Sequence, residues 1–149
     1  MDFYEQYRED NLKLEMRYPL YRCPAVNTDI VNILVQLSLA DNIKKSIIAI
    51  DSAMRLAGEV DADNKDETLL ATDILSAQFY HYNAEAFDKD AFTLLTQAVM
   101  RYNIVKASFD ESHDPRLIPE IEAMFVLPFT SIDHPSVIQL IRHSKLYNK

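Results

Sequence analysis

The chain has 149 residues, of which 48% are apolar, and a formal net charge of −8. This length and apolar content predict one ordered domain, residues 1–149, with a core of ordinary size. The negative charge argues against binding to duplex nucleic acid and against electrostatic docking on an anionic membrane, because both need a basic face.

The counts of glycine and cysteine narrow the fold class and the kinds of binding site that we expect. Gly58 is the only glycine, so neither a phosphate-binding loop nor a dinucleotide turn is expected. Sheet proteins with tight hairpins also use more glycine than this, and we therefore predict an all-α fold. Cys23 is the only cysteine, which fits a reducing, cytoplasmic location. No apolar run reaches the roughly 18 residues of a membrane span, so no transmembrane segment is expected.

The first part of the chain predicts helices separated by a connector. Residues 2–17 form the first helix, which ends before Pro19, and residues 18–25 are the connector. Residues 28–57 then carry a long apolar pattern that is either one bent helix or two. Gly58 follows at the position where a helix C-terminus prefers glycine.

Residues 59–67 are predicted to form an acidic loop. Residues 68–109, which follow it, are predicted to form two long helices. Two apolar repeats, each with alternating steps of three and four residues, lie on either side of a short polar link at residues 88–90. Each repeat predicts a helix with one apolar face. The short link predicts that these two helices pack on each other as an antiparallel hairpin.

The C-terminal part predicts shorter helices. Residues 110–115 form a polar break, and a brief apolar stripe then ends at Pro128. A last helix opens with Pro135, because proline is favoured in a first helical turn.

We predict neither a metal site nor a catalytic residue in this chain. A calcium loop starting at Asp61 would place Lys65, Asp66 and Thr72 where an oxygen ligand, a glycine and a carboxylate are needed. The four histidines match neither the Glu-x-x-His spacing of di-iron bundles nor zinc-ligand spacing. Cys23 is expected to be a small buried residue rather than a nucleophile.

Residues 47–82 resemble trans-prenyl diphosphate synthases. The buried helix that leads to the first Asp-rich motif of that family corresponds to IIAIDSAMRLAGEV. The helix after it corresponds to ATDILSAQFYHY, with Thr72–Asp73 in place of the family's Gly-Asp pair, and the next helix corresponds to TLLTQAVMRYNIVKASF. This resemblance implies an all-α helical bundle like half of the synthase fold.

The chain departs from the catalytic members of that family at their aspartates. MRLAGE occupies the position of the first DDxxD motif, and no second DDxxD follows. Clustered carboxylates hold the magnesium ions that bridge the substrate diphosphate, so this chain should not ionise a substrate alone. In its length the chain is most similar to component A, the small subunit of bacterial hexaprenyl diphosphate synthase, and it is also similar to heptaprenyl component I.

The resemblance implies a non-catalytic regulatory subunit that forms a heterodimer with a catalytic large subunit. It implies no cofactor in this chain, magnesium on the catalytic partner, and a hexaprenyl product for a menaquinone side chain. The candidate residues for the partner interface or for a tunnel that holds the product's prenyl chain are Ala71, Ile74, Leu75, Gln78, Phe79, Tyr82, Leu95, Val99 and Tyr102. The alternative is a helical interaction or adaptor protein without a part in isoprenoid synthesis.

Overall fold

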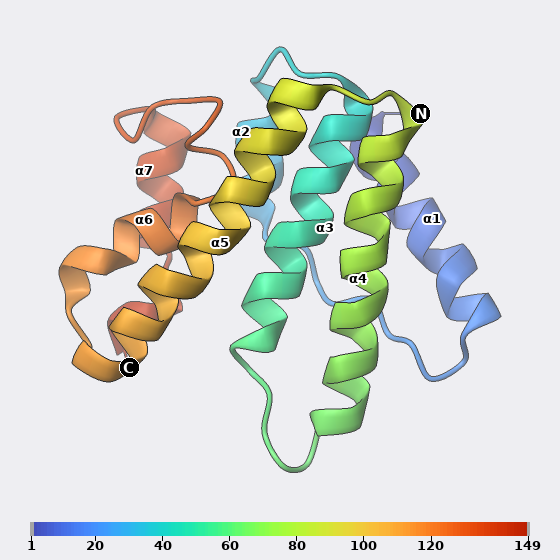
Figure 1. Ribbon diagram of the computed structural model, residues 1–149, viewed down its shortest axis with the longest axis horizontal. Helices are drawn as coiled ribbons and strands as arrows, with labels where there is room; N and C mark the ends of the chain where they lie inside the picture. Colours follow the sequence, from blue (N-terminus) through green and yellow to red (C-terminus); the bar gives the residue numbers. More distant parts are fainter. Residues whose placement is uncertain (1, 149) are drawn as a thin grey trace. The chain divides into compact units, whose positions relative to one another are not determined.

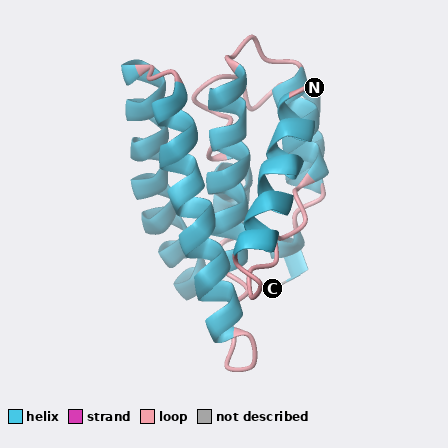
Figure 2. Cartoon of the chain, turned by 90° about the vertical axis from the view of Figure 1, so that its right-hand side faces the viewer, coloured by secondary structure: helices cyan, strands magenta, loops and turns pink. Residues whose placement is uncertain are grey.

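The computed structural model describes residues 2–148, and all regular structure in this range is helical (Figures 1 and 2). The predicted all-α fold is confirmed. The chain divides into two compact units. Unit 1 comprises the chain up to residue 27 and residues 39–87, and unit 2 comprises residues 28–38 and the chain from residue 88. The expectation of one domain over residues 1–149 stays a prediction.

Unit 1 consists of three helices, α1 (Phe3–Arg17), α3 (Asp41–Ala57) and α4 (Lys65–Glu85). The helices α3 and α4 lie side by side along their length, and α1 also packs against α3 (Figure 1). The predicted first helix is confirmed at both ends. The carboxylate of Asp2 caps it by accepting a hydrogen bond of 2.8 Å from the backbone N–H of Glu5, and the helix ends before Pro19.

The helix α3 is the centre of unit 1, since each residue from Asn42 to Ala53 is buried. It ends at Ala57 with Gly58 after it, as predicted. Gly58 has φ of −74°, which any residue can adopt. The left-handed conformation occurs instead at His113, with φ of 54°, where it terminates α5.

The acidic loop is shorter than predicted. Residues 65–67, expected in the loop, are the first turn of α4. Asp66 and Glu67 lie in this turn, where the unpaired N–H groups of a helix start favour negative charge. A run of acidic residues is therefore compatible with a helix N-terminus, and charge alone did not mark the boundary.

Unit 2 is built from α2 (Thr28–Val35), α5 (Lys89–Ser112) and several shorter elements. Those elements are the 3-10 turn η1 (Pro115–Leu117), α6 (Ile118–Ala123), α7 (Pro135–Arg142) and the 3-10 turn η2 (Lys145–Asn148). The amide of Gln36 donates to the hydroxyl of Ser136 over 2.8 Å, and the His143 ring nitrogen Nδ1 lies 2.8 Å from a carboxylate oxygen of Asp29. These contacts join α2 to the C-terminal helix α7 and its end. The apolar segment at residues 28–57 is thus two helices, one in each unit.

The two helices predicted within residues 68–109 are present as α4 and α5, and the carboxylate of Asp88 caps α5 by accepting from the N–H of Ala91 over 3.1 Å. Because α4 belongs to unit 1 and α5 to unit 2, their expected pairing as an antiparallel hairpin stays a prediction. The helix α4 packs along α3 in unit 1, whereas α5 packs against α6 in unit 2. The apolar repeat identifies a buried face but not the helix that covers it.

The C-terminal breaks lie close to the predicted positions. The helix α5 continues through Ser112, into the expected polar break, and Pro119 and Pro135 stand in the first turns of α6 and α7. The imidazole of His134 caps α7 by accepting from the N–H of Ser136 over 3.1 Å.

Candidate functional site

The inner face of α4 contains five of the six candidate residues on that helix. Ala71, Leu75, Gln78, Phe79 and Tyr82 are buried within the chain itself, and Ile74 is half-buried beside them. These residues recur every three or four positions and therefore share one side of the helix. The structure brings them together as predicted, but as core residues of unit 1.

Tyr82 is held by polar contacts from two other helices of unit 1. Its hydroxyl donates a hydrogen bond of 2.7 Å to the carboxylate of Asp10 on α1. The ammonium of Lys45 on α3 lies 4.8 Å from the centre of its ring. The Tyr7 ring lies 6.3 Å away, centre to centre. Burial, followed by the neighbouring carboxylate of Asp10, holds the pKa of Tyr82 far above its usual value, so the phenol stays protonated.

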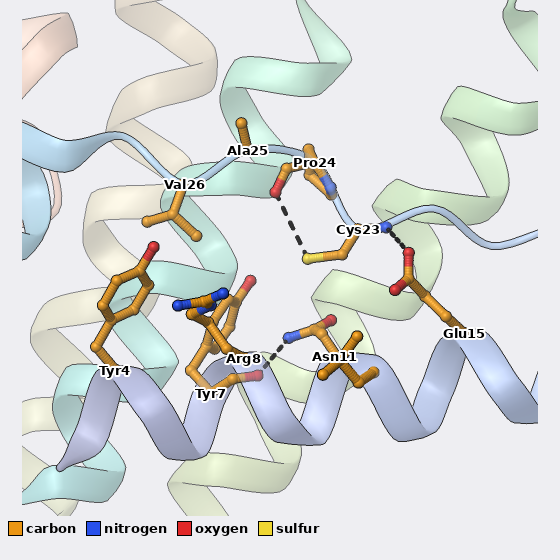
Figure 3. A pocket seen from close by; sticks show the side chains of 10 residues that line it. Tyr4, Tyr7, Arg8, Asn11, Glu15, Cys23, Pro24, Ala25 and Val26 are labelled. Atoms are coloured by element: carbon orange, nitrogen blue, oxygen red, sulfur yellow. Dashed lines mark hydrogen bonds between the residues drawn. The ribbon is translucent and has the colours of Figure 1, made fainter.

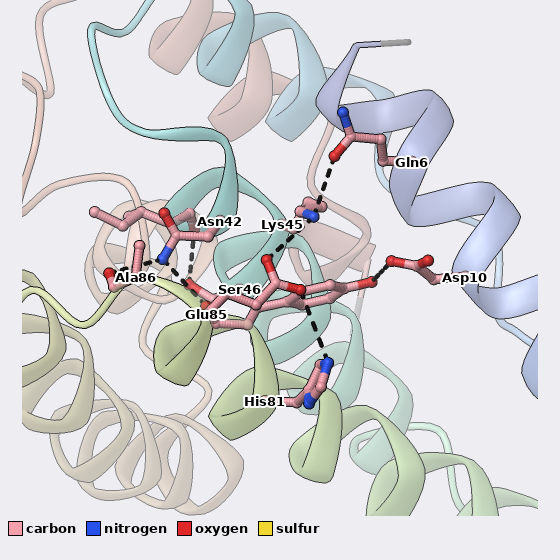
Figure 4. A network of polar contacts seen from close by, with 10 residues as sticks. Gln6, Asp10, Asn42, Lys45, Ser46, His81, Glu85 and Ala86 are labelled. Atoms are coloured by element: carbon pink, nitrogen blue, oxygen red, sulfur yellow. Dashed lines mark hydrogen bonds and ion pairs between the residues drawn. The ribbon is translucent and has the colours of Figure 1, made fainter.

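Lys45 satisfies its own buried charge within the same cluster. Its ammonium donates to the side-chain oxygen of Gln6 over 3.2 Å and to the carboxylate of Glu85 over 3.4 Å (Figure 4). Asn42 on α3 adds hydrogen bonds to the carbonyls of Tyr82 and Ala86, over 3.1 and 3.2 Å. This polar cluster ties together all three helices of unit 1. The spacing of apolar residues carries no signal for it, because its members are spread along the chain.

We expect Tyr82→Phe to reduce the free energy of unfolding by about 1–2 kcal/mol, because Asp10 loses its donor while the ring keeps its packing. Urea unfolding followed by circular dichroism measures this difference. Tyr80→Phe is the matched control, since it removes the same hydroxyl from an exposed tyrosine of the same helix. Equal effects of the two substitutions would contradict a stabilising role of the Tyr82 hydroxyl.

The inner face of α5 holds the other three candidate residues, in unit 2. Leu95 and Tyr102 are buried and Val99 is half-buried. The Tyr102 ring stacks on Phe125 with centres 5.8 Å apart and an angle of 27° between the planes. These three residues line one side of their helix, as predicted, and belong to a different unit from the six on α4.

The outer face of α4 was not among the predicted sites. Leu69 and Tyr80 expose 47% and 58% of their surface, and Phe87, two residues after the end of α4, exposes 64%. Ala77 and Ala84 lie exposed on the same side of the helix, and Asp73 is the only carboxylate among these residues. An apolar face of this length is unusual for a surface that only meets water. The signal was present in the sequence as a second three- and four-residue repeat.

The acidic residues before α4 are used to build a turn. One carboxylate oxygen of Asp61 accepts hydrogen bonds from the backbone N–H groups of Asp63 and Asn64, over 2.9 and 3.0 Å. The side-chain oxygen of Asn64 accepts in return from the N–H of Asp61 over 2.7 Å. In residues 2–148, no three His, Cys, Asp or Glu side chains are grouped as ligands for a metal ion.

A cavity of about 220 Å³ lies between α1 and residues 23–26 (Figure 3). Tyr7 and Asn11 form part of its wall, and the buried hydroxyl of Tyr7 has no hydrogen-bond partner. The Cys23 thiol contacts the carbonyl of Pro24 over 3.5 Å. Burial raises the pKa of this thiol, so it is protonated at neutral pH and is a poor nucleophile. The described lining of the cavity contains no histidine that could activate it.

No described helix is both long and apolar enough to cross a membrane.

A comparison with protein families identifies a relationship across most of the chain. Residues 1–130 match the family model described as hexaprenyl diphosphate synthase, small subunit. The match therefore includes all three helices of unit 1 together with α2, α5 and α6, and it ends before α7.

Proposed function

Because the chain belongs to the family of hexaprenyl diphosphate synthase small subunits, we propose that it is the non-catalytic, regulatory subunit of a two-component synthase. The match over residues 1–130 is the observation that carries this proposal. The partner is a catalytic large subunit with two Asp-rich motifs, and the heterodimer works in the cytoplasm. It condenses isopentenyl diphosphate onto farnesyl diphosphate to give the hexaprenyl chain of a menaquinone.

The arrangement of the carboxylates indicates which subunit binds the magnesium ions. Magnesium ions supply the charge that lets an allylic diphosphate leave, and several carboxylates must converge to hold them. In this chain the Asp61 carboxylate already accepts two backbone N–H groups, and Asp66 lies in the first turn of α4. These residues do not fit a magnesium site, so the proposal assigns the metal to the partner.

The outer face of α4 is our proposed docking surface for the catalytic subunit. Leu69, Tyr80 and Phe87 supply large apolar side chains, and the alanines between them allow a helix of the partner to approach closely. Interface centres are poor in charge and rich in aromatic residues, as this face is. The candidate residues on the inner face of α4 have a second proposed role, as a wall of the product tunnel.

The tunnel role is proposed separately for the candidate residues of each unit, six on α4 in unit 1 and three on α5 in unit 2. Seven of them are buried, and their apolar and aromatic side chains suit a prenyl chain. In unit 1, Phe79 and Tyr82 are the largest of these side chains. We propose that their size limits the length of the product.

The decisive experiment mixes the purified chain with a synthase subunit that carries two DDxxD motifs. We expect the two proteins to co-elute in size-exclusion chromatography and long-chain product to form only in the mixture. The matched control replaces the chain by the Tyr80→Asp/Phe87→Asp variant. Absence of both co-elution and product gain with the unmodified chain would favour an adaptor protein without a part in isoprenoid synthesis.

A further inference from the structure

The end of α1 and the loop after it carry the two most exposed large apolar side chains in the described part of unit 1. Met16 is 83% exposed and Leu20 is 78% exposed, and Tyr18 lies between them. Leu12 precedes Met16 by one helical turn and is also exposed. The loop turns back beneath the end of α1 (Figure 1). We call Met16, Tyr18 and Leu20, with the basic residues beside them, the α1 tip.

Basic side chains surround these apolar residues. Lys13 and Arg17 are exposed one turn apart, in the row of α1 that neighbours Met16. The guanidinium of Arg17 lies 5.5 Å from the centre of the Tyr18 ring. Arg22 donates to the carbonyls of Pro19 and Tyr21, over 2.6 and 2.8 Å, and so fixes the loop that presents Leu20.

The local charge of the α1 tip is opposite to that of the whole chain. Residues 12–22 contain the three cations Lys13, Arg17 and Arg22 and the single carboxylate Glu15, a sum of +2 in a chain of −8. The Glu15 carboxylate is turned to the N–H of Cys23, at 3.1 Å. At physiological salt, charges more than about 8 Å away are largely screened. An anionic surface at the tip therefore meets mainly its cations.

We infer that the α1 tip is a contact site for an anionic lipid surface. Exposed Leu, Met and Tyr side chains enter the apolar boundary of a bilayer, while Lys and Arg stay at the level of its anionic head groups. The choice of occupant rests on charge, because a local sum of +2 in a chain of −8 is complementary to anionic head groups. With only three cations the contact is weak and reversible.

The biological purpose of the lipid contact rests on the proposed function. The contact itself is inferred only from the residues of the α1 tip. A hexaprenyl chain is too apolar to leave an enzyme into water, so a synthase that touches a bilayer can release its product there. The outer face of α4 and the α1 tip are separate surfaces, made of different residues. Loss of one contact therefore need not affect the other.

The test is sedimentation of the purified chain with vesicles, alone and mixed with the catalytic subunit. We expect binding to mixed phosphatidylglycerol–phosphatidylcholine vesicles, weaker binding to pure phosphatidylcholine, and release by added salt. Met16→Ser/Leu20→Ser should reduce the bound fraction by about threefold or more. The matched control, Met100→Ser/Ile104→Ser, also removes two exposed apolar side chains and should bind like the unmodified chain.

A second pair of variants tests the charges. Lys13→Gln/Arg17→Gln should weaken binding to the mixed vesicles by about threefold, whereas Lys89→Gln/Arg142→Gln, with the same net charge, should not. No binding of the unmodified chain to mixed vesicles, or equal losses in tip and control variants, would overturn the inference. Loss of co-elution with the catalytic subunit in Met16→Ser/Leu20→Ser would also overturn it, by showing that a protein covers the tip. Failure of the chain to join a catalytic subunit leaves the vesicle result for the chain alone intact, so the two proposals fail separately.

Discussion

Phe79→Ala is expected to lower the free energy of unfolding by about 3–5 kcal/mol, the largest stability effect that we predict for a single substitution. Phe79 is almost fully buried on the inner face of α4, so alanine leaves a cavity in the core of unit 1. Urea unfolding followed by circular dichroism measures the loss. Phe87→Ala removes the same atoms from an exposed side chain and should cost less than about 1 kcal/mol.

This instability affects how the product tunnel is tested. Alanine variants at Phe79 and Tyr82 can lose activity because the chain unfolds, so Phe79→Leu and Tyr82→Phe are needed beside them. We expect the folded variants with smaller side chains to shift the product toward longer chains in the reconstituted synthase. Unchanged product lengths across the folded variants would exclude a role of these residues in the tunnel.

Tyr80→Asp/Phe87→Asp should weaken binding to the catalytic subunit by about a hundredfold or more, which corresponds to about 3 kcal/mol. Both side chains are exposed in the chain alone, so the substitutions should leave its fold intact. In the complex, each would place a carboxylate in an apolar contact without a partner. Calorimetric titration of the catalytic subunit measures the affinity.

The control for this effect lies on a different surface of unit 1. Met16→Asp/Leu20→Asp makes the same change of charge at the α1 tip and should keep the affinity for the catalytic subunit within about twofold. Thermal melting checks that both double variants are folded. Equal weakening by the two would place the interface elsewhere or spread it over both surfaces.

Much of the fold follows from local chemistry. The caps at Asp2, Asp88 and His134 act within two or three residues, and each stands where a helix was predicted to begin or close to it. The apolar faces of α4 and α5 follow from their repeats. The boundary at Lys65 was missed because acidic residues suit both a loop and the first turn of a helix.

The candidate site was predictable only in part. The repeat on α4 correctly groups Ala71, Leu75, Phe79 and Tyr82, but periodicity cannot tell whether such a face meets its own chain or another. The structure answers this for the inner face by burying it. On the outer face, Leu69 and Tyr80 are exposed, at 47% and 58%.

The sequence by itself determined the helical class, the family relationship and the absence of the two DDxxD motifs, since these depend on residue types and short spacings. The tertiary structure alone decided that α4 packs on α3, and that the Tyr82 hydroxyl meets Asp10, 72 residues away in the chain. It also decided that Met16 and Leu20 at the α1 tip are exposed, because the burial of an apolar side chain depends on which segments fold against it.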